Sequence, residues 1–250
     1  MTELPFRLVQ LTDLHLLADP KASYRGKDTR ANFLEGLALA KRLKPDLLIL
    51  TGDLAEDEQL VTYQWLYQQL EASGLAWQWL AGNHDQPELM NGFKQSDFYQ
   101  QTENWQVLGL NSHLPNATQG RLAASQLVRL KQALNNHKPL LIALHHPPVA
   151  VGSEWKDALA LQNADEFWAI LKDQPQAKLV VFGHVHQAFS QPKYHSLNLA
   201  TPATSAQFTA NANRFEINLT ALPALRLIRL KATGVYSTRL IYFPNAEKDL

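Results

Sequence analysis

Histidines and acidic residues gather at five places in this sequence, each just after a short apolar run. The best marked run is Leu179–Phe182, which is followed by Gly183, His184 and His186. A β-branched apolar run predicts a buried strand, and histidines two positions apart in extended geometry point to one face. Two neutral imidazoles at one strand end suit borderline divalent metals. An exposed strand end explains such a pair of histidines equally well. The residues at the other four places therefore decide whether the pair binds a metal.

Four further apolar runs end in residues of the same kinds. The runs and the residues after them are 6–11 with Asp13 and His15, 46–50 with Asp53, 75–80 with Asn83, His84 and Asp85, and 140–144 with His145 and His146. Taken singly, Asp53 after Gly52 is typical of a turn and His145 of an exposed loop. In α/β folds, ligands gather beyond the carboxyl ends of the strands, so the five places together favour a metal site.

The donor types predict two metal ions. We expect one ion to be held by Asp13, His15 and His186, and the other by Asn83, His145 and His184. Asp53 is the expected bridge, because one carboxylate can span two metals about 3.5–4 Å apart. Such a pair lowers the pKa of water and clamps the oxygens of an in-line displacement at phosphorus. We expect the remaining His84 to protonate a leaving alkoxide, with Asp85 orienting it.

The elements that must position these residues alternate between strand and helix over the first three quarters of the chain. Periodic apolar residues predict helices over 29–44, 56–71, 123–136 and 163–173, and a further strand over 105–110. Asn163 and Glu166 have the spacing of a capping box. The later strands are predicted over 195–199, 214–219, 225–231 and 235–243. This order favours an α/β fold in one domain, 1–250, with a motif-bearing core (6–210) and a C-terminal β-meander (211–245).

Composition narrows the partners. The 250 residues carry 23 basic and 23 acidic side chains and no cysteine. Zero net charge and the lack of a basic stripe argue against a nucleic-acid partner. Without cysteine thiolates, a metal ion must be bound by residues such as His, Asp and Asn. The first residues lack the basic and apolar regions of a signal peptide, and no apolar stretch approaches the ~20 residues that span a bilayer. We therefore expect a cytoplasmic protein with no membrane partner, its oligomeric state being open.

The motifs resemble those of a known family. Asp-x-His, Gly-Asp, Gly-Asn-His-Asp, His-His-Pro and Gly-His-x-His occur in the order of the calcineurin-like metallophosphoesterases, over Phe6 to His186. The resemblance implies a four-layer α-β-β-α sandwich of two mixed sheets, and its ligand roles match those assigned above. Fe and Mn are the expected metals and Zn is an alternative, since all three accept this donor set.

Differences from the motifs of two metallophosphoesterase subfamilies indicate which subfamily this sequence resembles. Purple acid phosphatases have a glycine at the position of His15 and a tyrosine at the position of Glu56. Protein Ser/Thr phosphatases have an arginine in the segment that corresponds to 52–58, which contains none here, and a glutamate at the position of Asp85. The sequence is more similar to class III cyclic-nucleotide phosphodiesterases, whose substrate loop resembles 152–163. Segment 200–208 is also similar, although Ala203 and Ser205 stand where that group often has serine and cysteine.

This resemblance implies hydrolysis of 3′,5′-cyclic AMP to 5′-AMP, with a cyclic nucleotide as the small-molecule partner. The expected substrate-binding residues are His15, Asp53, Asn83, His84, His186 and Trp155. The same site acting on 2′,3′-cyclic nucleotides or glycerophosphodiesters is an alternative, and zero net charge argues against a DNA nuclease. A second alternative is a non-catalytic scaffold, which would not need His84 as an acid.

Overall fold

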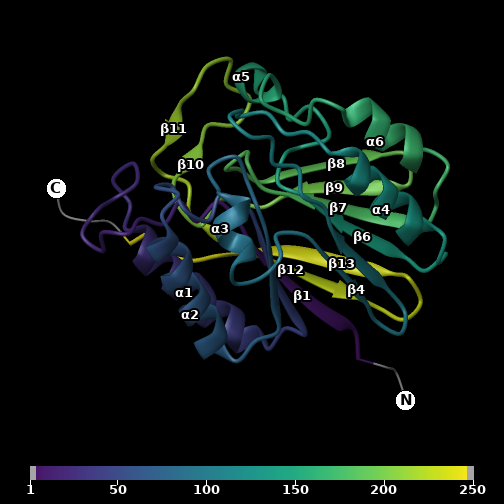
Figure 1. Ribbon diagram of the computed structural model, residues 1–250, viewed down its shortest axis with the longest axis horizontal. Coiled ribbons are helices and arrows are strands. Elements are labelled where there is room, and N and C mark those ends of the chain that lie inside the picture. The colour runs from purple at the N-terminus through teal and green to yellow at the C-terminus, as the bar shows by residue number, and fades with distance from the viewer. Residues whose placement is uncertain (1–3, 247–250) are drawn as a thin grey trace.

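Two β-sheets with helices on their outer faces form the structure, a computed structural model that describes residues 4–246 (Figure 1). The five-stranded sheet has the order β13-β12-β1-β2-β3, with bounds Tyr236–Tyr242, Ala224–Leu230, Phe6–Leu11, Leu47–Thr51 and Trp77–Leu80. The six-stranded sheet has the order β4-β5-β6-β7-β9-β8, with bounds Phe98–Gln101, Gln106–Gly109, Leu140–Ala143, Ala177–Phe182, Ser196–Ala200 and Phe189–Lys193. Helices α1 to α6 are Thr29–Leu43, Leu60–Ser73, Pro87–Asn91, Ala124–Leu134, Glu154–Asp157 and Ala164–Leu171.

Both sheets combine parallel and antiparallel pairs, which confirms the predicted sandwich of two mixed sheets. In the first sheet β1 and β2 are parallel, as are β2 and β3, whereas β12 runs antiparallel to β1. In the second sheet β6 is parallel to both β5 and β7. Helices α1 and α2 lie on one side of the molecule, and α4 and α6 lie on the other (Figure 1).

Alternation along the strands creates the apolar layers. Val9 and Leu11 of β1 belong to a buried cluster that includes Phe33 of α1 and Leu66 of α2. Leu8, which points to the opposite face of the strand, belongs instead to a cluster shared by the two sheets. Successive side chains of a strand point to opposite faces, so β1 packs against helices on one face and against the second sheet on the other.

The second sheet repeats this arrangement. Leu179 and Val181 of β7 lie in the cluster between the sheets, whereas Val180 packs in the outer cluster with Phe167 of α6. The strand is therefore buried on both faces, and this explains why it reads as a continuous apolar run.

Local chemistry fixes the ends of α1. The Asp28 side chain accepts a hydrogen bond from Ala31 N at 3.0 Å, as an N-cap does. Lys44 closes the helix in the left-handed region at φ 48°, and Pro45 cannot continue it. Helix α1 then returns the chain to β2, parallel to β1.

One predicted helix start and one predicted capping box are wrong. Helix α2 begins at Leu60 rather than at 56, because the chain after β2 runs beside Leu16: Glu56 N donates to Leu16 O at 2.9 Å. At the start of α6, Asn163 makes no side-chain capping bond. Its amide instead pairs with both backbone groups of Leu122 at 3.0 Å, which excludes the predicted capping box.

Two edge strands carry little apolar signal and were not predicted. β4 has the sequence FYQQ and β8 has the sequence FSQPK. Pro192 is tolerated in β8 because that strand lies at the sheet edge, where one side needs no hydrogen bonds.

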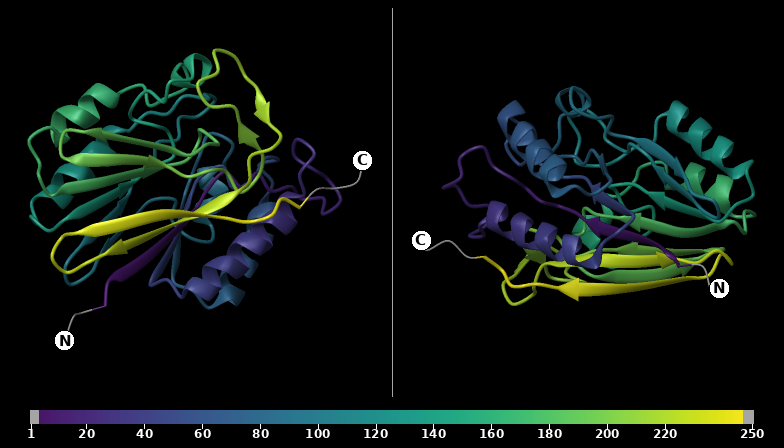
Figure 2. Two further views of the ribbon diagram at one scale, coloured as in Figure 1. Left: turned by 180° about the vertical axis from the view of Figure 1, so that it is seen from behind. Right: turned by 90° about the horizontal axis from the view of Figure 1, so that it is seen from below.

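The C-terminal strands divide between two sheets. β12 and β13 form an antiparallel hairpin that joins β1, as the yellow and purple strands of Figure 2 show. β11 (Ile217–Asn218) pairs with β10 (Gln207–Phe208) instead, so the strand expected over 214–219 does not continue into a meander with β12. The single domain over 1–250 stays a prediction, and 1–3 and 247–250 lie outside the described range. Within 4–246, no helix is long and apolar enough to cross a bilayer.

Candidate metal centre

The carboxyl ends of both sheets meet at one place, and the five predicted motifs follow β1, β2, β3, β6 and β7 there. His184 N, beyond β7, donates to the two carboxylate oxygens of Asp13 at 2.9 and 3.1 Å. His145 Nδ1, beyond β6, lies 2.7 Å from Thr51 O at the end of β2. Both contacts join the second sheet to the first, so the predicted convergence of the motifs is confirmed.

The first group of donors lies against β1 and β7. Asp13, His15, Asp53 and His186 each offer an atom within 4.8 Å of the others, and all four are buried. His15 Nε2 and His186 Nε2 are 3.1 Å apart, and His186 Nε2 lies 3.3 Å from Asp13 Oδ1. The three ligands predicted for one ion are therefore together with the predicted bridge.

The second group of donors centres on His145. Its Nε2 lies 3.3 Å from Asn83 Oδ1, 3.2 Å from His184 Nδ1 and 3.3 Å from Asp53 Oδ1. The other carboxylate oxygen of Asp53, Oδ2, lies 3.6 Å from His15 Nε2 in the first group. Asp53 thus directs one oxygen to each group.

The histidine hydrogen bonds fit metal binding. At Nδ1, His15 meets Glu56 Oε2, His145 meets Thr51 O and His186 meets Ala206 O, each at 2.7 Å. An imidazole that donates at Nδ1 in its neutral form has a free lone pair at Nε2, and here each Nε2 points into the centre. In this tautomer the Nε2 lone pairs of His15 and His186, 3.1 Å apart, both face the centre and can bind one cation.

Charges within the centre favour ionised carboxylates. Burial opposes ionisation of Asp53, but His145, His84 and His15 outweigh it and hold its pKa well below the usual range. The same carboxylate raises the pKa of His145 against the effect of burial. Burial lowers the pKa of His184 well below its ordinary value, which keeps that ring neutral. The Asp53 carboxylate and the neutral His184 ring are therefore in forms that bind metals, whereas His145 must release the proton that Asp53 favours.

The backbone of the centre is strained. Asp13, His15, Asp53, His184 and His186 have φ values of 52°, 46°, 51°, 69° and 51°. This left-handed conformation costs roughly 1–2 kcal/mol for a residue with a Cβ, and persists where the surroundings impose it. Five such residues at one site indicate that the loops are held for function.

Two motif glycines permit the close approach of the loops. A Cβ at Gly183 would lie 2.8 Å from Asp13 Oδ2 and 2.9 Å from Thr51 O. A Cβ at Gly82 would collide with Asp53 Oδ1 and lie 2.8 Å from His145 Cε1. Only glycine fits at these two positions, because a Cβ atom would displace the carboxylates of Asp13 and Asp53.

His84 lies beside the two groups, paired with Glu56. His84 Nδ1 is 3.1 Å from Glu56 Oε2, the same oxygen that contacts His15 Nδ1. Burial opposes the charged form of His84, but the hydrogen bond to Glu56 and the charge of Asp53 raise its pKa to about 9. Against burial, His15 and His84 together lower the pKa of Glu56 to about 2. The raised pKa favours the imidazolium form of His84, which is the form that a general acid needs.

Asp85, which was predicted to orient His84, accepts its hydrogen bonds from other groups. Its carboxylate accepts hydrogen bonds from the backbone N–H groups of Leu54, Ala55 and Gly82 at 2.9–3.1 Å, and from Tyr63 Oη at 3.1 Å. These contacts fix the loops after β2 and β3 rather than His84. The sequence analysis did not assign Glu56 the orienting role, although its place three residues after Asp53 was a signal.

His146 is buried beside His145 and His184, but both of its ring nitrogens have other partners. Nδ1 lies 2.9 Å from Ser112 Oγ, and Nε2 lies 3.2 Å from Thr118 O. His146 is therefore near enough to His145 and His184 to be a donor, but with both ring nitrogens in these contacts we assign it to neither donor group.

A pocket opens onto the centre between aromatic side chains. Tyr24 stacks on His15 with ring centroids 4.3 Å apart, and Phe208 stacks on His186 at 4.0 Å. Trp155, predicted to contact substrate, lines the same pocket. The same pocket is lined by Lys156 and Phe208, which lie in the segments 152–163 and 200–208 that resemble the substrate loop but were not singled out there. Tyr24 and Arg25 also line it, and no local pattern in the sequence marks them.

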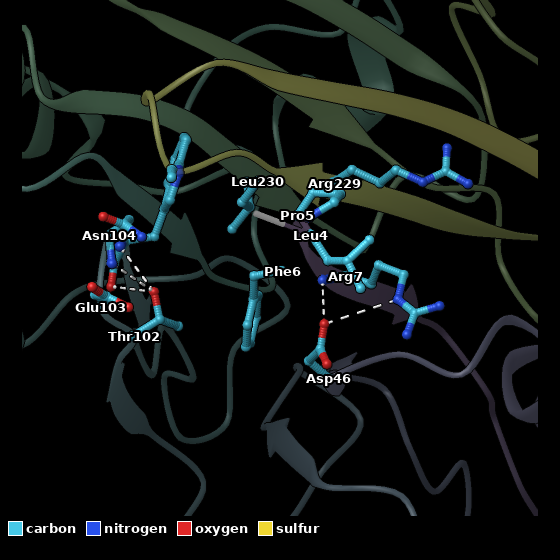
Figure 3. Close-up of a pocket in the computed structure, with 12 residues that line it drawn as sticks. Leu4, Pro5, Phe6, Arg7, Asp46, Thr102, Glu103, Asn104, Arg229 and Leu230 are labelled. Atoms are coloured by element: carbon cyan, nitrogen blue, oxygen red, sulfur yellow. Dashed lines mark hydrogen bonds and ion pairs between the residues drawn. The ribbon is translucent and has the colours of Figure 1, made fainter. Parts of the chain in front are cut away.

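A larger cavity of about 470 Å³ lies at the opposite end of the strands, where β1 and β2 begin (Figure 3). Its lining includes Asp46, which accepts a hydrogen bond from Arg7 N at 2.7 Å. Its lining contains no histidine, and ligands of such folds gather at the other strand ends. The centre, not this cavity, therefore has the chemistry of a site.

Comparison with known proteins agrees with the fold and the donor set. The family model described as calcineurin-like phosphoesterase matches residues 6–188. The chain belongs to this family. The calcineurin-like family uses a dinuclear metal site, and the two donor groups are its candidate ligands here.

Individual relatives cover nearly the whole chain. A 3′,5′-cyclic-nucleotide phosphodiesterase of Nostoc sp. is 38% identical over 97% of this chain and 94% of its own. The 3′,5′-cyclic adenosine monophosphate phosphodiesterase CpdA of Pseudomonas aeruginosa is 34% identical over 95% and 90%. Among solved structures, a dimetal phosphatase from Danio rerio aligns over 97% of this chain and 100% of its own, with a TM-score of 0.69 and 11% identity, and shares the fold.

Proposed function

We propose that this calcineurin-like phosphoesterase hydrolyses 3′,5′-cyclic AMP to 5′-AMP at the metal centre. The observation that carries the proposal is the position of Asp53, whose two oxygens lie 3.3 and 3.6 Å from histidine nitrogens of two separate donor groups. The names of the relatives from Nostoc and Pseudomonas support the substrate. The proposed location is the cytoplasm, where nucleotides are made and held.

Seven side chains would hold two metal ions. They are Asp13, His15, Asp53 and His186 for one ion, and Asn83, His145, His184 and again Asp53 for the other. Fe or Mn is proposed, with Zn as the alternative. When bound, such ions activate water and neutralise charge that develops on the phosphate oxygens.

The chain's own residues supply the remaining steps. His84, held by Glu56 as an imidazolium, would donate its proton to the departing 3′ oxygen of the ribose. The proposed substrate-binding residues are His15, Asp53, Asn83, His84, His186 and Trp155. Trp155 contacts Phe208 and Phe215 edge-on, so its ring can border a purine without filling the pocket.

A turnover panel tests the proposal. Protein reconstituted with Mn or Fe is assayed on 3′,5′-cyclic AMP, 2′,3′-cyclic AMP and glycerophosphodiesters, with metal content measured alongside. We expect about two ions per chain and the highest kcat/KM for 3′,5′-cyclic AMP. A higher value for another diester would establish the alternative substrate, and no turnover with full metal content would establish a scaffold.

A further inference from the structure

Lys156 is a buried cation that the mechanism above does not use. It lies on α5, is 6% exposed and lines the pocket over the metal centre. Its Nζ lies over the rings of Trp155 at 5.0 Å and Phe208 at 5.5 Å. No carboxylate among residues 4–246 lies within ion-pair distance of this Nζ.

A second donor without a partner lies next to it. Trp155 Nε1 is buried and makes no hydrogen bond within the described chain. A buried polar group without a partner costs free energy, and a buried charge costs more. Lys156 and Trp155 both belong to the short helix α5 and both line one pocket, so a ligand bound there could accept hydrogen bonds from them.

The charge of Lys156 indicates what that ligand is. Burial lowers the pKa of Lys156 to about 8, against the attraction of Asp13 and Asp53. Those two carboxylates are also the proposed metal ligands, so bound cations would remove that attraction. An anion that enters the pocket would then balance the ammonium and keep Lys156 protonated. Arg25 adds a second cation at the mouth, packed over Phe215 at 4.5 Å.

We propose that Lys156 binds an oxygen of the substrate's phosphate, with Trp155 Nε1 as a neighbouring donor. The identity of the anion as a cyclic phosphodiester rests on the proposed function, whereas the contact itself requires only a phosphate oxygen. Lys156 is then a substrate-binding residue, and its unbalanced charge in the free protein is a cost that ligand binding relieves.

Phosphate binding tests the contact without any turnover. Metal-loaded wild type, Lys156→Met and Lys156→Arg are titrated calorimetrically with inorganic phosphate. Lys193→Met is the matched control, because Lys193 lies over Trp168 at 4.9 Å, away from the pocket lining. We expect Lys156→Met to weaken phosphate binding roughly 10- to 100-fold, as loss of a charged hydrogen bond does, and Lys156→Arg to restore part of it. The control should bind like wild type.

Thermal unfolding of the metal-free proteins separates binding from packing. Methionine retains the apolar stem and removes the charge, so Lys156→Met should melt at the same temperature as wild type or higher. Unchanged phosphate affinity in Lys156→Met would overturn the proposal, as would a lowered melting temperature that accompanies weaker binding.

Turnover distinguishes this inference from the proposed function. We expect kcat/KM for 3′,5′-cyclic AMP to fall in Lys156→Met by a factor similar to that for phosphate binding. If wild type does not hydrolyse cyclic AMP but phosphate binding depends on Lys156, the proposed function fails and the contact stands. If wild type hydrolyses it and Lys156→Met matches wild type in both measurements, the contact fails and the function stands.

Discussion

His84 and Glu56 form the part of the centre that lies beside the two donor groups. The backbone N–H of His84 donates to Asp53 Oδ1 at 2.9 Å, which fixes the residue next to the proposed bridge while its ring turns to Glu56. A ribose alkoxide is a poor leaving group, so a held imidazolium at this point has a specific use.

Replacing His84 by alanine should preserve metal content and lower turnover of 3′,5′-cyclic AMP by about 10²–10⁴-fold. The loss on bis(4-nitrophenyl) phosphate should be much smaller, because nitrophenolate leaves without a proton. The two substrates are compared at equal metal occupancy. Equal losses would show that His84 binds substrate or stabilises charge, and that another group delivers the proton.

Glu56→Gln should reproduce this selective loss in weaker form, because the glutamine amide cannot stabilise the imidazolium as the carboxylate does. A double-mutant cycle measures it: with His84 already replaced by alanine, the further change of Glu56 should add little on cyclic AMP. If the two substitutions instead lowered turnover independently, so that their effects multiplied, Glu56 would act only through its contact with His15.

Asp53 and Asn83 should differ in how many metal sites they affect. Asp53 Oδ1 and Oδ2 face different donor groups, whereas Asn83 Oδ1 contacts only His145 among them. Asp53→Ala should therefore weaken both sites in a metal titration, and Asn83→Ala chiefly one. Equal losses at a single site in both variants would refute the bridge.

The loops after β2 and β3 are joined by one side chain. Asp85 accepts from Leu54 and Ala55 beyond β2 and from Gly82 beyond β3, and Tyr63 ties it to α2. Asp53 and Asn83 are carried by these same loops. The positions of two proposed ligands therefore depend on a residue that touches neither metal group.

Asp85→Asn should destabilise the metal-free protein by about 1–3 kcal/mol, because an amide nitrogen then faces backbone N–H donors. Urea denaturation measures the change. Asp19→Asn serves as the control, since the Asp19 carboxylate accepts an exposed hydrogen bond from Lys21 N. If Asp85→Asn lost activity but kept the stability of wild type, Asp85 would have a catalytic role and not a structural one.

The two sheets are joined below the centre by a buried polar network. Gln10 Nε2 of β1 donates to Thr51 Oγ1 at 2.8 Å and to Phe182 O at 3.1 Å. Thr201 Oγ1 donates to Gln10 Oε1 at 2.7 Å, and Arg226 Nε donates to Thr201 Oγ1 at 3.1 Å. The network fixes how the strand ends of one sheet meet those of the other, and so how the donor groups meet.

Gln10→Ala should lower the free energy of unfolding by about 2–4 kcal/mol, since buried partners in both sheets lose their hydrogen bonds. Gln78→Ala, at a half-buried position on β3, should cost less than about 1 kcal/mol. Chemical denaturation of both variants measures the difference. Similar small losses would mean that apolar packing alone aligns the sheets.

The sequence determined where the chemistry begins and how the chain alternates. Strands buried on both faces form continuous apolar runs, and helices show a period of 3.6 residues. The strands β1, β2, β3, β6 and β7 could therefore be located, and the residues after them noted. The edge strands β4 and β8 were missed because their exposed faces need no apolar pattern. The parallel order of the main strands then placed the motifs at one edge.

The three-dimensional structure decided which side chains face one another. Glu56 contacts the ring of His84, whereas Asp85 accepts backbone hydrogen bonds, because the loops after β2 and β3 pack together in a way that sequence spacing does not specify. Lys156 entered the pocket through packing of α5 against Phe208, a contact between segments about fifty residues apart. Such contacts depend on how two sheets and their loops pack together, and no local preference of the chain encodes them.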